Sequence, residues 1–319
     1  MKSHKKEIIT VAILMAAAVV IFAGILKPEA TQTKKCSLIY IPKIRDNTND
    51  FWTSVISGCK MAAEEYESDL EILAPDKEEN IEEQNKLLKK AIEQKPDAIL
   101  FSPSSMDASD ELLKEAKEKG IRITYIDSYT KEKLQDLTVA GRMLGEYARK
   151  LIDKDSKIAI VSHVKGVSTA VEREQGFREG LGDYADNIVD IVYCNSLYEK
   201  SYELAQELMR KYPDLELIAG MNEYSAVGVG RAVSDAGAKD KIAVVGVDCS
   251  QEAINLMEMG VYKGIIVQKA FRMGYIGVEE TIHMLNGDAV EKNIDSGCEL
   301  VTPENMYNSD IERLIFPFS

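Results

Sequence analysis

The chain has 319 residues, of which 45% are hydrophobic and 29% charged, so it carries enough apolar material for one or two folded α/β cores. Its formal net charge of −14 excludes a general attraction to nucleic acid or to an anionic membrane surface, because phosphate would be repelled unless a local basic patch outweighed this charge. The composition predicts an acidic, folded protein with two lobes.

The N-terminal segment differs in kind from the rest of the chain. Basic residues between Lys2 and Lys6 precede an uncharged run from Ile8 to Leu26, which approaches the roughly 20 residues needed to cross a bilayer. Positive charges are more numerous before this run than just after it, so we expect the head to stay cytoplasmic and the rest to be exported. No clean cleavage site follows, and Cys36 lacks the small apolar residues that precede a lipoprotein cysteine. The pattern favours an uncleaved signal anchor and stalk over residues 1–35, rather than a cleaved signal or a lipid anchor.

The spacing of cysteines and histidines indicates neither a metal site nor a catalytic centre. The five cysteines are odd in number, widely spaced and without a C-x-x-C pair. His163 and His283 are the histidines of the exported part, and no Ser/His/Asp or Cys/His set is recognisable. Gly228 and Gly230 lie inside a helical pattern without the third glycine of a dinucleotide-binding loop. We therefore expect no cofactor, no metal and no enzymatic activity.

Short β-branched runs alternate with helical patterns from Cys36 onward. Strands are predicted over residues 37–41, 70–74, 97–101 and 122–126, and again, after residue 137, over residues 157–161, 188–192, 216–219 and 242–247. Helices are predicted over residues 51–66, 81–92, 140–152, 169–181, 199–211 and 224–236. Apolar strands between helices indicate parallel sheets covered on both faces. The two blocks predict an α/β fold of two doubly wound parallel-sheet lobes, with the polar stretch 130–138 as the first crossing between them.

Polar residues recur at the carboxyl ends of the predicted strands, where open parallel sheets bind their ligands. A neutral polyol needs aromatic surface for its C–H faces and a ring of carboxylates, amides and guanidinium for its hydroxyls. The candidate ligand-binding residues of these two kinds are Asn49, Phe51, Trp52, Asp127, Arg173, Asn222, Asp248 and Gln268.

Each candidate also has a simpler structural interpretation. Asn49, Asn222 and Asp248 are residue types that cap helix N-termini. Arg173, between two glutamates, is compatible with a solvated charge on a helix. Phe51 and the only tryptophan, Trp52, are compatible with ordinary core residues. The placement of all of these residues at the same end of their strands favours a shared site.

The chain resembles the ribose/galactose-type periplasmic sugar-binding proteins over about residues 37–305, and more distantly the effector core of lactose-repressor-like regulators. The matching pieces, in order, are TNDFWTSVISGCKMAAEE, DAILFSPSS, ITYIDS, KGVSTAVEREQGFREGL, LIAGMNEYSAVGVGRAV, IAVVGVDCS, YKGIIVQ and LVTPENM. The resemblance implies a type I periplasmic binding protein fold with a three-crossing hinge, near residues 130–138, 248–268 and 295–297. It implies an N-terminal lobe of residues 36–137 plus about 269–296, and a C-terminal lobe of residues 138–268 plus about 297–319.

The resemblance also implies that the eight candidate residues contact the ligand, but it has two departures. Sugar-binding members often place an arginine directly after the aspartate that Asp127 matches, and this chain has Ser128 there. An aromatic residue often found after the strand at 188–193 is matched by Ser196. Because a bidentate donor and a stacking face are both lost, ribose itself becomes a doubtful ligand, and another sugar or a small polyhydroxylated signal fits as well.

We expect an extracytoplasmic, membrane-anchored, monomeric solute-binding protein that closes on a sugar or polyol and presents it to the membrane permease of an ABC-type importer. The alternative is a ligand sensor that signals to a membrane histidine kinase, and an enzyme is a remote third. A DNA-binding repressor is excluded because the hydrophobic run stands where a helix-turn-helix would be, and no basic footprint for nucleic acid exists.

Overall fold

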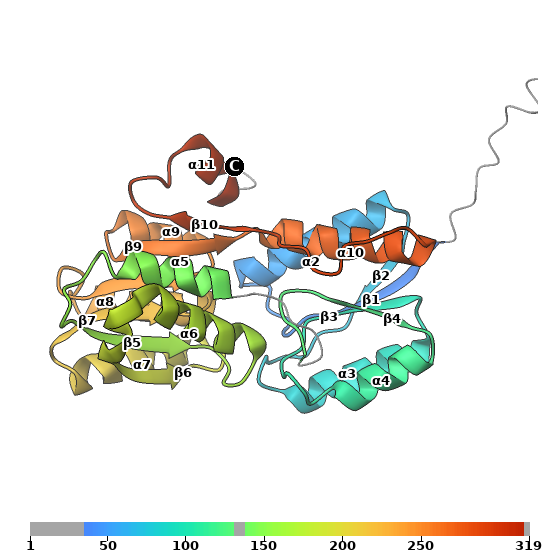
Figure 1. Cartoon of the computed structure of the whole chain (residues 1–319), viewed down its shortest axis with the longest axis horizontal. Helices are drawn as coiled ribbons and strands as arrows, with labels where there is room; N and C mark the ends of the chain where they lie inside the picture. The colour runs from blue at the N-terminus through green and yellow to red at the C-terminus, as the bar shows by residue number, and fades with distance from the viewer. Residues whose placement is uncertain (1–34, 131–137, 316–319) are drawn as a thin grey trace, which may run out of the picture. The chain divides into compact units, whose positions relative to one another are not determined.

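The computed structural model describes residues 35–130 and 138–315, and residues 36–319 form one compact unit. The predicted signal anchor lies outside the described residues. Within the described ranges, no helix is both long enough and apolar enough to cross a membrane. The described part is an α/β fold with two sheets, each covered by helices (Figure 1).

The first sheet is parallel throughout and has the strand order β2-β1-β3-β4. Its strands are β1 Ser37–Ile41, β2 Asp69–Ile72, β3 Ala98–Phe101 and β4 Arg122–Tyr125. Its helices are α2 Asp50–Glu65, α3 Ile81–Gln94, α4 Asp110–Glu118 and α10 Ala270–Asn286. We call this sheet with its helices the first lobe.

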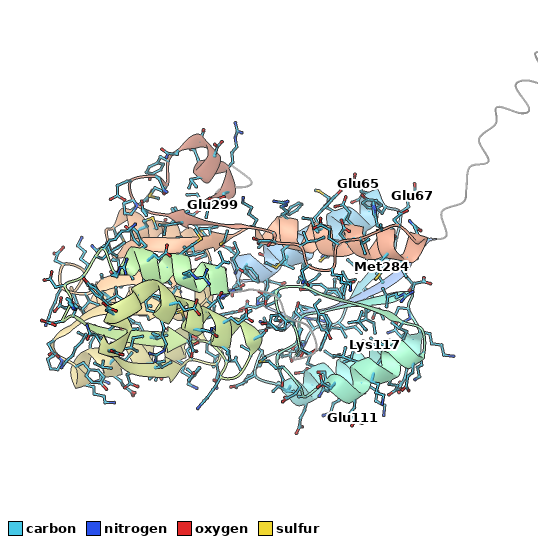
Figure 2. All side chains as sticks on the ribbon, in the orientation of Figure 1. Glu65, Glu67, Glu111, Lys117, Met284 and Glu299 are labelled. Carbon is cyan, nitrogen blue, oxygen red and sulfur yellow. The ribbon has the colours of Figure 1, made fainter. Side chains whose placement is uncertain are left out.

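Side-chain alternation along the strands decides which helices cover which face of the first sheet. Leu38 and Tyr40 of β1 pack in a cluster with the buried faces of α2 and α10. Ile39 and Ile41 of the same strand point the other way, into a cluster with α3 and α4. Charged side chains such as those of Lys117 on α4 lie on the exposed side of the helices (Figure 2).

The second sheet has the order β10-β9-β8-β7-β5-β6 and is parallel except at β10. Its strands are β5 Lys157–Ser162, β6 Ile188–Tyr193, β7 Leu215–Gly220, β8 Ala243–Val247, β9 Tyr262–Gln268 and β10 Cys298–Val301. Its helices are α5 Thr138–Ala148, α6 Ser168–Leu181, the 3₁₀ helix η1 Gly182–Asn187, α7 Tyr198–Lys211, α8 Glu223–Asp235, α9 Gln251–Glu258 and α11 Ser309–Ile315. We call this sheet with its helices the second lobe.

The chain passes from one sheet to the other after β4, again after β9, and a third time before β10. Gln268 ends β9, and α10 begins at Ala270 and packs against α2. Gly58 of α2 and Gly274 of α10 allow this close approach, because a Cβ on Gly58 would lie 2.0 Å from the carbonyl oxygen of Phe271. The chain then returns as β10, which pairs antiparallel with β9.

The predicted strands are confirmed, with ends that differ by at most two residues from the sequence expectation. The structure adds elements that the sequence pattern did not predict, notably α4, α9, α10 and the edge strand β10. β10 has only four residues, most of them half-buried, so its sequence lacks the apolar run that marks the buried parallel strands. Its partner strand β9 supplies the hydrogen bonds that hold it extended.

Candidate ligand-binding site

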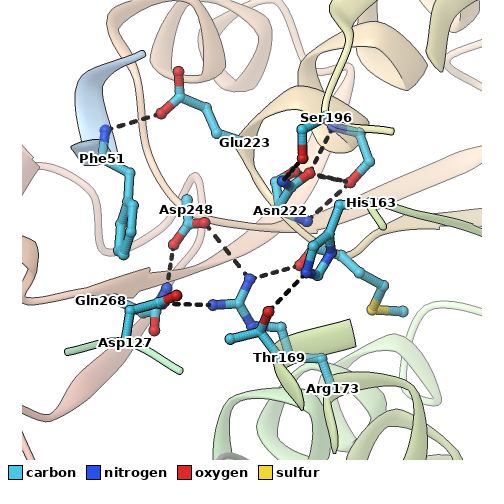
Figure 3. Close-up of polar contacts among 12 residues, drawn as sticks. Phe51, Asp127, His163, Thr169, Arg173, Ser196, Asn222, Glu223, Asp248 and Gln268 are labelled. Carbon is cyan, nitrogen blue, oxygen red and sulfur yellow. Dashed lines mark hydrogen bonds and ion pairs between the residues drawn. The ribbon is translucent and has the colours of Figure 1, made fainter. Parts of the chain in front are cut away.

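A small cavity lies where the strands of both sheets end, and residues from both lobes line it (Figure 3). Its volume is about 20 Å3, room for about one water molecule. The lining residues are Lys43, Asn49, Phe51, Trp52, Glu78, Asp127, His163, Thr169, Arg173, Asn222, Glu223, Tyr224 and Asp248. Seven of the eight predicted ligand residues are in this set, and Gln268 contacts it through Asp248.

A larger cavity of about 500 Å3 adjoins the small one, since Asp127 and Arg173 line both. Gln268 and the segment 291–298 also line the larger cavity. We place the candidate site in the small cavity because seven of the eight predicted ligand residues line it, whereas only Asp127, Arg173 and Gln268 of that set line the larger cavity.

Asp127 follows β4 and is buried in the first lobe. Its φ of 65° is in the left-handed region, which non-glycine residues seldom adopt, and such conformations cluster at functional sites. One carboxylate oxygen lies 2.8 Å from Lys43 Nζ, and the other lies 3.9 Å from Arg173 Nη2. Asp127 therefore lies between a lysine of its own lobe and an arginine of the second lobe.

Asp248 occupies the matching position at the end of β8 in the second lobe, also with a positive φ, of 73°. It accepts a hydrogen bond from Gln268 Nε2, and its other oxygen lies 3.7 Å from Arg173 Nη1. Burial raises the pKa of Asp248, and the nearby charge of Arg173 opposes that rise. The capping interpretation is wrong for Asp248, because Ser250 is the residue that caps α9.

Arg173 lies on α6, with only 4% of its surface exposed, so it is not a solvated helix charge. It donates a 2.8 Å hydrogen bond to the carbonyl oxygen of Met221 and lies at ion-pair distance from Asp127 and Asp248. A guanidinium held between two carboxylates is fixed in direction, which suits it to bind oxygen-rich groups.

Asn49 and Asn222 are both helix caps, as their simpler interpretation predicted. The side-chain oxygen of Asn49 accepts a hydrogen bond from the N–H of Trp52, and that of Asn222 accepts one from the N–H of Ser225. Their amide nitrogens are directed elsewhere: Asn222 Nδ2 lies 3.4 Å from Ser196 Oγ. Capping and cavity lining occur together here because helices α2 and α8 begin at the cavity.

Phe51 and Trp52 line the cavity and also belong to the core of the first lobe. Their rings meet edge to face, with centroids 5.0 Å apart. Tyr224 of the second lobe lies in the same hydrophobic cluster, so the three rings that line the cavity are gathered together. The other lining residues are polar, which gives the cavity an aromatic part and a hydrogen-bonding part.

The structure adds lining residues that the sequence interpretation missed. Lys43 and His163 follow β1 and β5, so the strand-end rule that found Asp127 could have found them. Glu223 directly follows Asn222 in sequence. Glu78 lies in the loop before α3, and nothing in its local sequence marks it as a site residue.

Two of the added residues have strongly shifted proton affinities. Burial raises the pKa of Glu223 to about 8, although hydrogen bonds from Tyr198 and from the N–H of Phe51 act in the opposite direction. Burial, together with the charges of Arg173 and Lys43, lowers the pKa of His163 well below its usual value. His163 is therefore neutral at pH 7, and its Nε2 lies 2.8 Å from Thr169 Oγ1.

The cavity is lined by hydrogen-bond donors and acceptors beside aromatic side chains. In the described part of the chain, no group of three or more His, Cys, Asp or Glu residues is placed to hold a metal ion. Carboxylates accept from hydroxyl groups, while Arg173, Lys43 and Asn222 donate to them.

The periplasmic binding protein domain model matches residues 40–289. The D-ribose/D-allose-binding protein of Pseudomonas aeruginosa is 24% identical over 272 residues, which cover 80% of this chain and 85% of that protein. A solved sugar transporter from Clostridium phytofermentans is 39% identical with a TM-score of 0.80, covering 84% of this chain and 99% of its own. A carbohydrate transporter solute-binding protein from Agrobacterium radiobacter, in complex with D-arabinose, is 25% identical with a TM-score of 0.83, covering 88% of this chain and 99% of its own. The chain belongs to the periplasmic binding protein family, an extracytoplasmic family whose relatives named here bind or transport sugars.

Proposed function

We propose that this protein is an extracytoplasmic solute-binding protein that binds a sugar or sugar-like polyol in the small cavity and presents it to an ABC-type importer. The observation that carries the proposal is the placement of Arg173 between Asp127 and Asp248, at the carboxyl ends of strands in two different sheets. A sugar hydroxyl both donates and accepts, so it can bond to a carboxylate and to the guanidinium at once. The family match and the sugar-binding relatives support this proposal.

Ligand binding in this site requires the lobes to open and close. Ligand pockets typically measure roughly 300 Å3 or more, and the small cavity measures about 20 Å3. A sugar therefore enters a more open form, and closure follows because the ligand contacts both lobes and binds the closed form better. The chain connections between the sheets, of which residues 131–137 lie outside the described residues, are proposed as the hinge, and closure is the change that a partner reads.

The N-terminal segment, which lies outside the described residues, is proposed to hold the protein at the membrane. The support is the uncharged run from Ile8 to Leu26 behind a basic head. Intact-mass analysis of protein extracted from membranes should find this segment still attached. A mature protein that begins after residue 26, or a lipid adduct on Cys36, would show that the anchor proposal is wrong.

Isothermal titration calorimetry on residues 36–319, which form one compact unit, tests the sugar assignment. D-ribose, D-allose and D-arabinose are the first probes, since relatives are named for them or were solved with them. We expect saturable 1:1 binding of at least one, and small-angle scattering should show a smaller radius of gyration at saturation. Absence of binding to any sugar would overturn the proposed ligand class, and identical scattering with bound sugar would overturn closure.

The partner is the second part of the proposal, and a histidine kinase sensor is the alternative to the importer. Addition of the sugar-loaded protein to the reconstituted permease complex should stimulate ATP hydrolysis. Stimulation of kinase autophosphorylation, with no effect on ATP hydrolysis by the permease complex, would favour the sensor instead.

A further inference from the structure

Ser128 and Ser196 stand where the family resemblance predicts an arginine and an aromatic ring, and both are turned to other partners. Ser128 Oγ donates a 3.0 Å hydrogen bond to the carbonyl oxygen of Pro103 and does not line the cavity. Ser196 Oγ donates a 2.5 Å hydrogen bond to Glu78 Oε2, across the two lobes. The donor and the surface that these serines do not supply must come from other residues.

Lys43 is one of these residues, and its ammonium group is buried in the cavity with only 2% of the residue exposed. Its Nζ lies 2.8 Å from Asp127 Oδ2, 3.1 Å from Thr169 Oγ1 and 3.7 Å from Glu78 Oε1. Lys43 thus supplies a cationic donor beside Asp127.

Glu78 lies beside Lys43, with Oε1 3.7 Å from its Nζ, and it supplies an acceptor from an equally buried position. Oε2 accepts the hydrogen bond from Ser196, but Oε1 accepts none, although it is shielded from solvent in the wall of the cavity. A buried carboxylate oxygen without a hydrogen bond is costly, so this atom is an acceptor in need of a donor. A ligand in the cavity can supply that donor.

We propose that Lys43 and Glu78 bind the ligand as an ion pair and select an uncharged polyhydroxylated molecule over its amino and acidic derivatives. The inference rests on the proposed function and refines it. A hydroxyl placed between the two groups accepts from Lys43 and donates to the free oxygen of Glu78, so both are satisfied. A ligand ammonium or carboxylate in that place meets one group of like charge and one of opposite charge, because Lys43 and Glu78 both face it. The ion pair then gives the ligand charge no net attraction to offset the loss of its hydration in a buried site, which disfavours both classes.

Two substitutions test separately the two charges that we propose to select the ligand, an arrangement that we call the charge filter. Glu78→Gln keeps the shape and an acceptor for Ser196 but removes the negative charge, and Lys43→Met removes the positive charge while keeping the aliphatic stem. Glu79→Gln and Lys77→Met are the matched controls, since both residues are exposed neighbours of Glu78 outside the cavity. Thermal unfolding of each variant without ligand establishes that it is folded before binding is measured.

The binding probes are D-ribose, D-allose and D-arabinose, each with its 2-amino-2-deoxy derivative and its uronic acid, measured by titration calorimetry. The unaltered chain should bind a neutral sugar at least 100-fold more tightly than either charged derivative. Glu78→Gln should reduce the discrimination against the uronic acid at least tenfold, and Lys43→Met should do the same for the amino sugar. The two controls should leave both ratios unchanged.

The outcomes distinguish this inference from the proposed function. Sugar binding with unchanged ratios in Glu78→Gln would overturn the charge filter and leave the sugar-binding function in place, even if Lys43→Met failed to fold. Equal binding of neutral and charged derivatives by the unaltered chain would also overturn the charge filter and leave the sugar-binding function in place. Failure of all the chains to bind any probe would overturn the proposed function, and the filter with it.

Discussion

Glu223 and Phe51 connect the two lobes through a helix N-terminus. The Oε2 atom of Glu223 accepts a 3.1 Å hydrogen bond from the backbone N–H of Phe51 (Figure 3). Its Oε1 atom lies 3.3 Å from the backbone nitrogen of Asp50. Because α2 begins at Asp50, a carboxylate of the second lobe satisfies free N–H groups of a first-lobe helix. Asp50 reciprocates, since its Oδ2 accepts a 3.1 Å hydrogen bond from the N–H of Gln251 at the start of α9.

These reciprocal contacts predict that Glu223 stabilises the closed form through its hydrogen bonds to the start of α2, and that the bound ligand leaves these hydrogen bonds in place. Glu223→Gln should weaken sugar binding about threefold to tenfold, mainly through faster dissociation, because an amide has one acceptor oxygen where the carboxyl group places two against the N–H groups of α2. Stopped-flow binding measures this effect. Glu207→Gln, an exposed substitution on α7, is the control. Equal dissociation rates in the two variants would contradict the role of Glu223.

The raised pKa of Glu223 predicts a pH dependence of folding stability. Its pKa rises from an ordinary value of 4.5 to about 8 on folding, so the folded chain holds more protons, and the free energy of unfolding should fall as pH rises through this interval. Asp248, whose pKa burial also raises, contributes with the same sign. Folding lowers the pKa of His163, so its contribution to the free energy of unfolding has the opposite sign and increases as pH rises, mainly below its ordinary pKa of 6.5.

The window from about pH 7.5 to 8 is therefore governed by the carboxyl groups, because the histidine is almost fully deprotonated there in both the folded and the unfolded chain. Urea unfolding at several pH values should show a decrease of at most about 1.4 kcal/mol per pH unit from Glu223. Glu223→Gln should flatten this slope. A slope that persists unchanged in the variant would mean that another group carries it.

Asp248 is predicted to bind ligand hydroxyls, since it ends β8 at the cavity and does not cap α9. Asp248→Ala should weaken sugar binding by at least about 1.5 kcal/mol, the usual range for a hydrogen bond to a charged group. Titration calorimetry measures the change, with the exposed substitution Asp240→Ala as the control. An unchanged affinity in a folded Asp248→Ala variant would remove Asp248 from the site.

Trp52 is predicted to report ligand binding, because it is the only tryptophan and lines the cavity while 4% exposed. A sugar that enters beside its ring changes the polarity around it, so the emission spectrum should shift or change intensity on saturation. Trp52→Phe should abolish the signal and retain binding measured by calorimetry. A spectrum that does not respond to a bound sugar would assign Trp52 to the core alone.

The rhythm of strands and helices was predictable from the sequence, because buried parallel strands require apolar runs and covering helices require one apolar face. The same regularity located Asp127 and Asp248, since a polar residue directly after such a run must lie at the carboxyl edge of a sheet. It did not locate β10, whose four residues are held extended by pairing with β9 rather than by an apolar pattern of their own.

Only the tertiary structure decided which charges face one another in the cavity. Glu78 and Ser196 are 118 residues apart and lie in different lobes, so their hydrogen bond leaves no local pattern in the sequence. The contact of Glu223 with the start of α2 likewise depends on the two lobes meeting at the cavity. Periodicity reports which face of an element is buried, whereas a contact between lobes depends on distances that the folded chain alone fixes.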